Sequence, residues 1–368
     1  MKKDELFYRL ALCKVDGIGP VRFKKLIEQV GSAEEIFSKS FKQLKSLSGL
    51  SEANVHAIKG FIGFSLIENE INFAEKHGIR ILDFEHQDYP KRLSYCVDSP
   101  SILFYKGTAD LNQQRIVSII GTRLFTEYGR RVCEELVVGL KTYDVSVVSG
   151  LAFGIDAIAH KASLKSEMPT IGVVAHGLDT IYPGAHQKLS NEMLLNGGLV
   201  SEYYSGTKAE KGNFPARNRI VAGMSDATII IETDIKGGGS MITAEIADSY
   251  NRDVFCVPGR IHDSKSNGCN YLIKSLKAQM VTNAEDIANS LGWNQQKKLK
   301  GNQRNLFIEL SSNESMIFEL LKSNEVMHID EFYAHTKLSS SELASSILSL
   351  EMQHIIRVAP GKLVSLID

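Results

Sequence analysis

Six short runs rich in valine and isoleucine alternate with helix-like segments through the middle of the chain. The runs are 116–120, 145–149, 170–175, 199–203, 227–232 and 253–257. The segments between them fit helices at about 127–142, 155–166, 185–196, 217–224 and 240–250. Nearly continuous apolar strands are typical of a parallel sheet that is buried on both faces. The alternation predicts a doubly wound α/β domain, in which ligands bind beyond the carboxyl ends of the strands.

Length and composition fit a globular protein of several domains. The chain has 368 residues, of which 43% are hydrophobic and 23% are charged, and this size suits two or three domains. No apolar run is long enough to cross a membrane, and the N-terminus lacks the apolar core of a signal peptide. We therefore expect a cytoplasmic protein without a membrane partner. The five cysteines are scattered without CxxC spacing, which favours core thiols over disulfides or a zinc site.

The chain divides into three regions and a linker. In the first, 1–78, the glycine turns Val15–Pro20 and Leu47–Ser51 each join two helical patterns. This arrangement is typical of a tandem helix-hairpin-helix, whose turn amides can hold a phosphate, although glycine capping of ordinary helices gives the same pattern. The α/β domain occupies 79–292.

A polar linker, 293–311, precedes the last region, 312–368. Helical patterns near 314–322, 328–336 and 340–352 precede a hairpin at 355–365 that turns at Pro360-Gly361, as in a winged helix. Residues 305–368 carry four Lys/Arg and nine Asp/Glu, so this region is strongly acidic although the whole chain has a net charge of only −1. Because phosphate binding needs a basic face, we predict a protein-interaction or dimerisation role for it.

Two glycine-bearing turns follow neighbouring strands of the expected sheet. Gly121, Thr122 and Arg123 follow the run 116–120, and Ser149–Asp156 joins the next run to a helix. Such turns leave backbone N–H groups at a helix start, where the helix dipole favours an anion. We expect these turns to contact phosphates, with the second turn acting through Ser149, Gly150 and Gly154, and Arg123 making a charge-assisted contact.

A second unusual cluster is Phe214–Arg219. Arg217, Asn218 and Arg219 open a predicted helix, where basic residues are unusual unless they meet an anion. An aromatic ring beside cations is the usual composition of a single-strand platform, on which the ring stacks a base. A core phenylalanine with internal ion pairs is the alternative. Lys208 and Lys211 lie upstream and extend the cationic segment.

A third glycine turn, Gly237–Glu245, enters a helix after the run 227–232, and its Gly239 and Ser240 are further candidates for anion contact. The rest of the chain shows no catalytic or cofactor signature. The dinucleotide and Walker A fingerprints are absent, and His160, His176 and His186 fit structural positions. No residues have metal-ligand spacing, so we expect no metal and no cofactor.

Taken together, these motifs resemble the DNA-processing protein A family (DprA, also called Smf). The segments that carry the resemblance are Tyr89–Pro90, Asp98–Pro100, Leu103–Gly107, Gly121–Gly129, Ser149–Asp156, Phe214–Arg219, Ser240–Glu245 and Arg252–Gly259. They occur in the family's order across about 80–275. The flanking regions look like the helical and winged-helix additions of that family.

The resemblance implies an extended Rossmann-like domain that binds single-stranded DNA. It also implies a non-enzymatic homodimer that helps to load the RecA recombinase during natural transformation. By similarity, Arg123 grips phosphate, Phe214 stacks a base, and an upstream lysine contributes, with Lys208 and Lys211 both open as the match.

An enzymatic alternative starts from Gly237–Glu245. This segment echoes the glycine-rich motif of nucleotide phosphoribohydrolases of the lysine-decarboxylase-like group, although the proline and the spacing of that motif are missing. An NAD-binding oxidoreductase is disfavoured because the fingerprint is absent.

Overall fold

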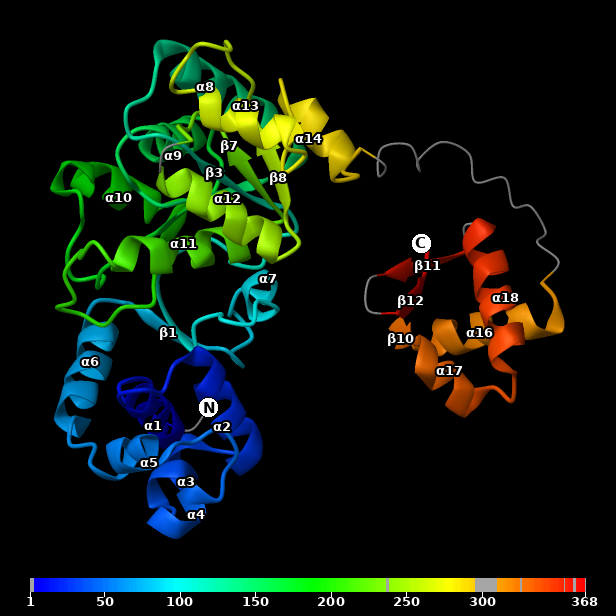
Figure 1. Cartoon of the computed structure of the whole chain (residues 1–368), viewed down its shortest axis with the longest axis horizontal. Coiled ribbons are helices and arrows are strands. Elements are labelled where there is room, and N and C mark those ends of the chain that lie inside the picture. The colour runs from blue at the N-terminus through cyan, green and yellow to red at the C-terminus, as the bar shows by residue number, and fades with distance from the viewer. Residues whose placement is uncertain are drawn as a thin grey trace. The chain divides into compact units, whose positions relative to one another are not determined.

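The computed structural model describes residues 3–235, 238–294, 310–324, 326–353, 355–359 and 362–367. The chain forms two compact units, Met1–Gln295 and Gln296–Asp368. The first unit combines a helical N-terminal part with an α/β part, and Figure 1 shows the helices of the N-terminal part in blue.

Six helices build the N-terminal part. They are α1 (Lys3–Cys13), α2 (Pro20–Val30), α3 (Ala33–Ser38), α4 (Phe41–Lys45), α5 (Glu52–Lys59) and α6 (Phe64–Lys76). The two predicted glycine turns lie side by side, because Arg22 donates hydrogen bonds to the carbonyl oxygens of both Gly17 and Gly49. Arg9 Nη1 on α1 donates a buried hydrogen bond at 2.9 Å to Asp83 Oδ1 on the first strand of the sheet, which connects these helices to the sheet.

Nine strands form a single sheet in the described part of the first unit. They are β1 (Arg80–Asp83), β2 (Ile102–Gly107), β3 (Ile116–Ile120), β4 (Ser146–Ser149), β5 (Thr170–Val173), β6 (Gly197–Ser201), β7 (Ala227–Ile230), β8 (Asp253–Cys256) and β9 (Gln279–Met280). Their order is β1-β2-β6-β5-β4-β3-β7-β8-β9. The pairs from β6 to β9 are parallel, whereas β1 and β2 run antiparallel at one edge.

The prediction of a doubly wound, mainly parallel sheet is confirmed, and the six predicted runs correspond to β3 through β8. Sequence patterns did not predict β1, β2 or β9 as strands. The last of these is only two residues long, Gln279–Met280, and both residues are exposed, so it lacks the apolar run that marks a buried strand.

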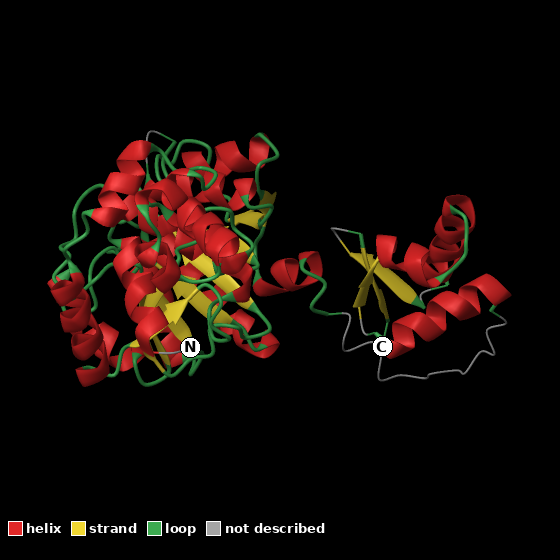
Figure 2. Cartoon of the chain, turned by 90° about the horizontal axis from the view of Figure 1, so that it is seen from below, coloured by secondary structure: helices red, strands yellow, loops and turns green. Residues whose placement is uncertain are grey.

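Helices cover both faces of the sheet (Figures 1 and 2). They are α7 (Lys91–Ser94), α8 (Glu127–Leu140), α9 (Ile155–Lys165), α10 (Gln187–Met193), α11 (Asn213–Gly223), α12 (Gly239–Ser249), α13 (Asn267–Lys274) and α14 (Ala284–Ser290). One apolar core joins α11, α12 and α13 to the sheet, and a second joins α8, α9 and α14 to the opposite face. Alternate residues of β3 point into the two cores, as Ile116 and Val117 do.

The second unit has the predicted winged-helix pattern. It contains α16 (Ser312–Ser323), β10 (Val326–His328), α17 (Ile329–His335), α18 (Ser340–Met352), β11 (Ile356–Ala359) and β12 (Leu363–Leu366). The described strands β11 and β12 form the expected hairpin, and β10 adds a third strand that the sequence did not predict. The predicted turn at Pro360-Gly361 lies outside the described residues, as does most of the predicted linker.

Candidate nucleic-acid interface

A groove of about 850 Å³ opens beyond the carboxyl ends of β3, β4 and β7. Strand β3 pairs with β4 on one side and with β7 on the other, so the chain order reverses at this point. Open α/β sheets bind ligands at such a switch point. The groove lining includes these predicted site residues: Gly121, Thr122, Arg123, Gly150, Lys211, Phe214, Arg217, Asn218, Gly239 and Ser240. Ser149, Gly154, Lys208 and Arg219 are not among its lining residues.

The second glycine turn does not present free amides to a ligand. The carboxylate of Asp156 accepts hydrogen bonds from the N–H groups of Gly150, at 3.1 Å, and Ala152, at 3.3 Å. Burial raises the pKa of Asp156, whereas the Arg217 charge and these two N–H groups lower it. The expectation of unpaired amides in this turn is therefore wrong for Gly150 and Ala152, because both N–H groups already donate to a side chain from the following helix.

The first glycine turn, Gly121–Arg123, is likewise held by hydrogen bonds within the protein. The N–H of Thr122 donates to the carbonyl of Glu232 at 2.7 Å, and the carbonyl of Thr122 accepts from Ile155 N–H at 3.2 Å. Gly154 has φ +85°, and a Cβ there would collide with the Thr122 carbonyl. Glycine at position 154 therefore lets the two turns pack closely against each other.

Two predicted serines also make internal contacts. Ser149 is fully buried, and its hydroxyl donates to the carbonyl of Ile119 at 2.6 Å. Ser240 is buried as well, and its hydroxyl donates to Thr233 Oγ1 at 2.7 Å. Each hydroxyl therefore donates its hydrogen to a neighbouring oxygen of the protein and not to a ligand.

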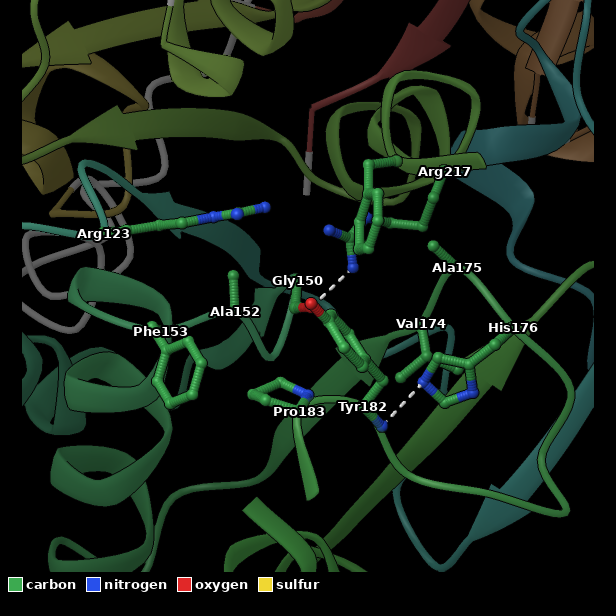
Figure 3. Close-up of a pocket in the computed structure, with 11 residues that line it drawn as sticks. Arg123, Gly150, Ala152, Phe153, Val174, Ala175, His176, Tyr182, Pro183 and Arg217 are labelled. Carbon is green, nitrogen blue, oxygen red and sulfur yellow. Dashed lines mark hydrogen bonds between the residues drawn. The ribbon is translucent and has the colours of Figure 1, made fainter. Parts of the chain in front are cut away.

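Arg217 is the largest departure from the sequence prediction. Helix α11 begins at Asn213, so Arg217 lies in its second turn and not at its N-terminus. Its side chain is buried, and Nη1 donates to the carbonyl oxygen of Gly150 at 2.5 Å (Figure 3). The same Nη1 also donates to the carbonyl oxygen of Val173. Burial lowers the pKa of this guanidinium, the Asp156 charge raises it and the Arg123 charge lowers it. Arg217 is thus a structural cation that joins the ends of two strands to α11.

Arg219 is also used internally. Its guanidinium forms an ion pair with Glu202 and donates to the carbonyl of Asp98 at 2.8 Å. Only 13% of the Arg219 side chain and 16% of the Glu202 side chain are exposed. For Arg219, therefore, the alternative of an internal ion pair that the sequence analysis left open is the one that the structure shows. Arg219 also lies outside the groove lining.

The Arg123 side chain, in contrast to those of Arg217 and Arg219, remains available to contact a ligand. Within the described part of the chain, no hydrogen bond or ion pair joins its guanidinium to another side chain or carbonyl. The guanidinium carbon lies 5.7 Å from the centroid of the Phe214 ring, which is within cation–π range. Arg123 is therefore a cation at the groove surface that forms no ion pair with a described carboxylate, although Asp156 and Asp234 also line the groove.

Phe214 is half-buried and is accompanied by a second ring that sequence reasoning missed. The Tyr182 ring lies 5.9 Å from the Phe214 ring at an angle of 53° and is 50% exposed. Both rings line a small recess beside the groove, together with Phe153 (Figure 3). The Tyr182 N–H donates to His176 Nε2 at 3.1 Å, which fixes the backbone of this loop.

The structure separates the two candidate lysines. Lys211 is exposed and lines the groove, whereas Lys208 is exposed outside it and its carbonyl accepts from Asn213 Nδ2 at 3.2 Å. Asn218 lines the groove and bridges two elements, because its Nδ2 donates to the carbonyl of Gly239 at 3.3 Å. The groove therefore combines the cations Arg123 and Lys211 with a partly exposed aromatic pair.

The described residues contain no group of three or more His, Cys, Asp or Glu that could hold a metal ion. Three histidines singled out in the sequence are buried and hydrogen-bonded: His160 to Thr170 at 2.7 Å, His176 to Gly177 O at 2.8 Å, and His186 to Leu151 O at 2.9 Å. All five cysteines are free thiols. None of the described helices has the length and apolar character needed to cross a bilayer.

Fold and site together define a doubly wound α/β protein with a cationic, aromatic groove at its topological switch point and with helix-hairpin-helix and winged-helix modules. The sequence profile for DNA recombination-mediator protein A matches residues 80–292, so the chain belongs to this family. Further profiles match a SAM-like helix-hairpin-helix tandem over 10–61 and a DprA winged helix domain over 308–362.

Whole-chain relatives agree with this assignment. The chain is 30% identical over 397 residues to protein Smf of Synechocystis, with 98% of both chains covered. It is 41% identical over 199 residues to the DNA processing protein DprA of Streptococcus pneumoniae, covering 54% of this chain and 70% of the relative. The family acts as a mediator of recombination and not as an enzyme, so the phosphoribohydrolase alternative is set aside. The position of Glu245, the acidic residue of that alternative, agrees with this, because Glu245 is exposed on α12 outside the groove lining.

Two solved structures have a similar fold. The crystal structure of DprA from Streptococcus pneumoniae aligns with a TM-score of 0.67 at 32% identity, covering 77% of this chain and 97% of that one. A structure of DNA processing protein A from Helicobacter pylori, described by its single-stranded DNA binding mode, aligns with a TM-score of 0.53 at 34% identity, covering 59% and 96%.

Proposed function

We propose that this chain binds single-stranded DNA along the groove at the switch point of its sheet. The observation that carries the proposal is the contact of Arg123, which forms no ion pair with a described carboxylate, with the Phe214 ring, beside the half-exposed ring of Tyr182. Single-strand sites combine cations that follow the backbone with aromatic side chains that stack bases. The DNA-binding mode described for the Helicobacter pylori relative supports the same polymer class for this chain.

The residues have separate roles in this proposal. Arg123 and Lys211 contact backbone phosphates, and Phe214 stacks a base, with Tyr182 supporting its ring. The glycines 121, 150 and 154 and the buried Arg217 hold the loops that form the groove. Because phosphate contact and stacking are nearly independent of base identity, binding has little sequence preference.

We also propose that the bound protein acts as a homodimer and helps to load RecA recombinase onto the strand during natural transformation. This step rests on the family, which is described as a mediator of recombination. The α/β region 79–292 carries the DNA-binding part of this function. No bond is made or broken by the protein, so its contribution is to hold the strand in a form that the recombinase can occupy.

A mobility-shift experiment tests the DNA-binding step. A labelled oligo-dT and a duplex of equal length are titrated with the full chain at two salt concentrations. We expect preferential binding of the oligo-dT and an affinity that falls steeply with salt. Absence of binding to the single strand at low salt contradicts the proposal.

RecA loading requires a separate measurement. The strand is first covered with single-stranded DNA-binding protein, and the DNA-dependent ATPase activity of RecA is followed with and without this chain. We expect a shorter lag with the wild-type chain and no shortening with a variant that does not bind DNA. An unchanged lag at saturating protein removes the loading role and leaves the DNA-binding step intact.

A further inference from the structure

The winged-helix unit has an apolar groove that is unrelated to the DNA site. Its volume is about 280 Å³, and it lies between α17, α18 and β11. The apolar side chains that line it are Ile329, Tyr333, Leu343, Ile347, Leu348 and Val358. Leu348 is 58% exposed and Tyr333 is 41% exposed, so two large side chains at this groove remain open to solvent.

The composition of this face does not suit nucleic acid. A winged helix that reads DNA places its third helix in the major groove and needs cations to meet the phosphates. Helix α18 contains no Lys or Arg, and α17 contains none either. The exposed face of α18 instead presents Ala344, Leu348 and Met352, which follow one another at helical spacing.

The charge around the groove is negative. Among the described residues that line the groove, Glu351 is the one with a charge, and its carboxylate accepts a hydrogen bond from the N–H of Val358 at 3.3 Å. Asp330 lies exposed in the first turn of α17, one helical turn before Tyr333. Arg357 precedes Val358 on β11, so its side chain points to the opposite face of the strand.

From these observations we infer that the groove between α17, α18 and β11 is the docking site for an amphipathic helical segment of a protein partner that carries Lys or Arg beside its apolar side chains. Apolar side chains of the segment cover Leu348 and Tyr333, and its cations face Glu351 and Asp330. Amphipathic helices commonly bind apolar grooves in this way, and charge complementarity sets the choice of partner. A second copy of the same acidic unit would place like charges together, which disfavours self-association here.

Peptide binding to the full chain tests this inference. Two labelled 16-residue helical peptides share one leucine stripe, and their flanking positions are all Lys in one and all Glu in the other. Fluorescence anisotropy is expected to show at least tenfold tighter binding of the Lys peptide. Absence of binding, or equal affinity for both peptides, overturns the inference.

Two matched variants locate the contact. Leu348→Gln is expected to weaken binding of the Lys peptide at least fivefold. Met316→Gln changes another exposed apolar residue, on α16 and outside the groove lining, and is expected to leave the affinity within twofold. Because both side chains are exposed, both variants keep the core, and thermal unfolding checks this. Equal effects of the two substitutions overturn the site.

The other occupants give distinct results. A fall in the sedimentation coefficient of Leu348→Gln alone would identify a second copy as the occupant, and a loss of duplex affinity in that variant would identify DNA. Either result overturns the inference. Binding of oligo-dT by the α/β part is expected to be the same in Leu348→Gln and wild type, so this test is independent of the proposed DNA site.

Discussion

Arg217 and Asp156 converge on Gly150 from different helices. The Arg217 guanidinium donates to the Gly150 carbonyl at 2.5 Å, and the Asp156 carboxylate accepts the Gly150 N–H at 3.1 Å. A Cβ at position 150 would lie 2.7 Å from both Arg217 Nη2 and Asp156 Oδ2, so only glycine fits between the two groups. This arrangement fixes the end of β4 and hence one side of the groove.

Removal of Arg217 is predicted to destabilise the protein, because it leaves the Asp156 carboxylate buried without its compensating charge. We expect Arg217→Ala to cost about 3–5 kcal/mol in urea unfolding, and we expect the double variant Arg217→Ala/Asp156→Ala to cost less than the sum of the single changes. If Arg217→Ala retained wild-type stability and lost only DNA affinity, Arg217 would be a phosphate ligand instead.

Arg123 and Phe214 are predicted to affect DNA binding in different ways. Arg123→Ala should reduce oligo-dT affinity and lower the slope of log K against log[salt] by about 0.7, which is the value for one phosphate contact on a single strand. Phe214→Ala should reduce the binding free energy for oligo-dT by about 1–3 kcal/mol and leave the salt slope unchanged, because stacking releases no counterions. Lys188→Ala, at a 91% exposed side chain on α10, is the control for general charge loss. Equal slope changes in the Arg123 and Phe214 variants contradict these roles.

The two upstream lysines are predicted to differ. Lys211 lines the groove and Lys208 does not. Lys211→Ala should therefore weaken oligo-dT binding severalfold and lower the salt slope by about 0.7, whereas Lys208→Ala should be near wild type. Titrations of both variants over the same salt series check this. A larger loss in Lys208→Ala would mean that the strand leaves the groove along a different path.

His160 is predicted to make stability depend on pH. Burial lowers its pKa from 6.5 to about 3. Between these values the unfolded chain binds a proton that the folded protein does not, so stability falls as the pH falls through this range and is fully present above 6.5. A single histidine with this lowered pKa reduces the free energy of unfolding by about 2 kcal/mol at pH 5 relative to pH 7.5.

Urea unfolding at pH 7.5 and 5.0 measures this loss. We expect His160→Asn to lose about 2 kcal/mol less than the wild type between the two pH values, whatever its stability at pH 7.5. His262→Asn changes an exposed histidine and should keep the wild-type pH dependence. Parallel pH profiles for the wild type and His160→Asn would assign the acid sensitivity to other groups.

Sequence patterns determined the α/β class of this protein. The valine and isoleucine runs that became β3 through β8 are buried on both faces, so burial alone imposes a recognisable composition on them. The order of these runs and the glycine turns after them also located the groove, since parallel strands end at one edge. Arg123 and Phe214 meet there although 91 positions separate them in sequence.

Only the tertiary structure decided which polar groups remain available to a ligand. Arg217 and Arg219 look like exposed cations in the sequence, yet one is buried beside Asp156 and the other is paired with Glu202. Partners such as Asp156 and Glu202 come from other elements, so no local pattern reports them. Hydrogen bonding and charge pairing depend on distances of a few ångströms between segments that are remote in sequence. The burial of a strand, in contrast, can be predicted from the composition of the strand itself.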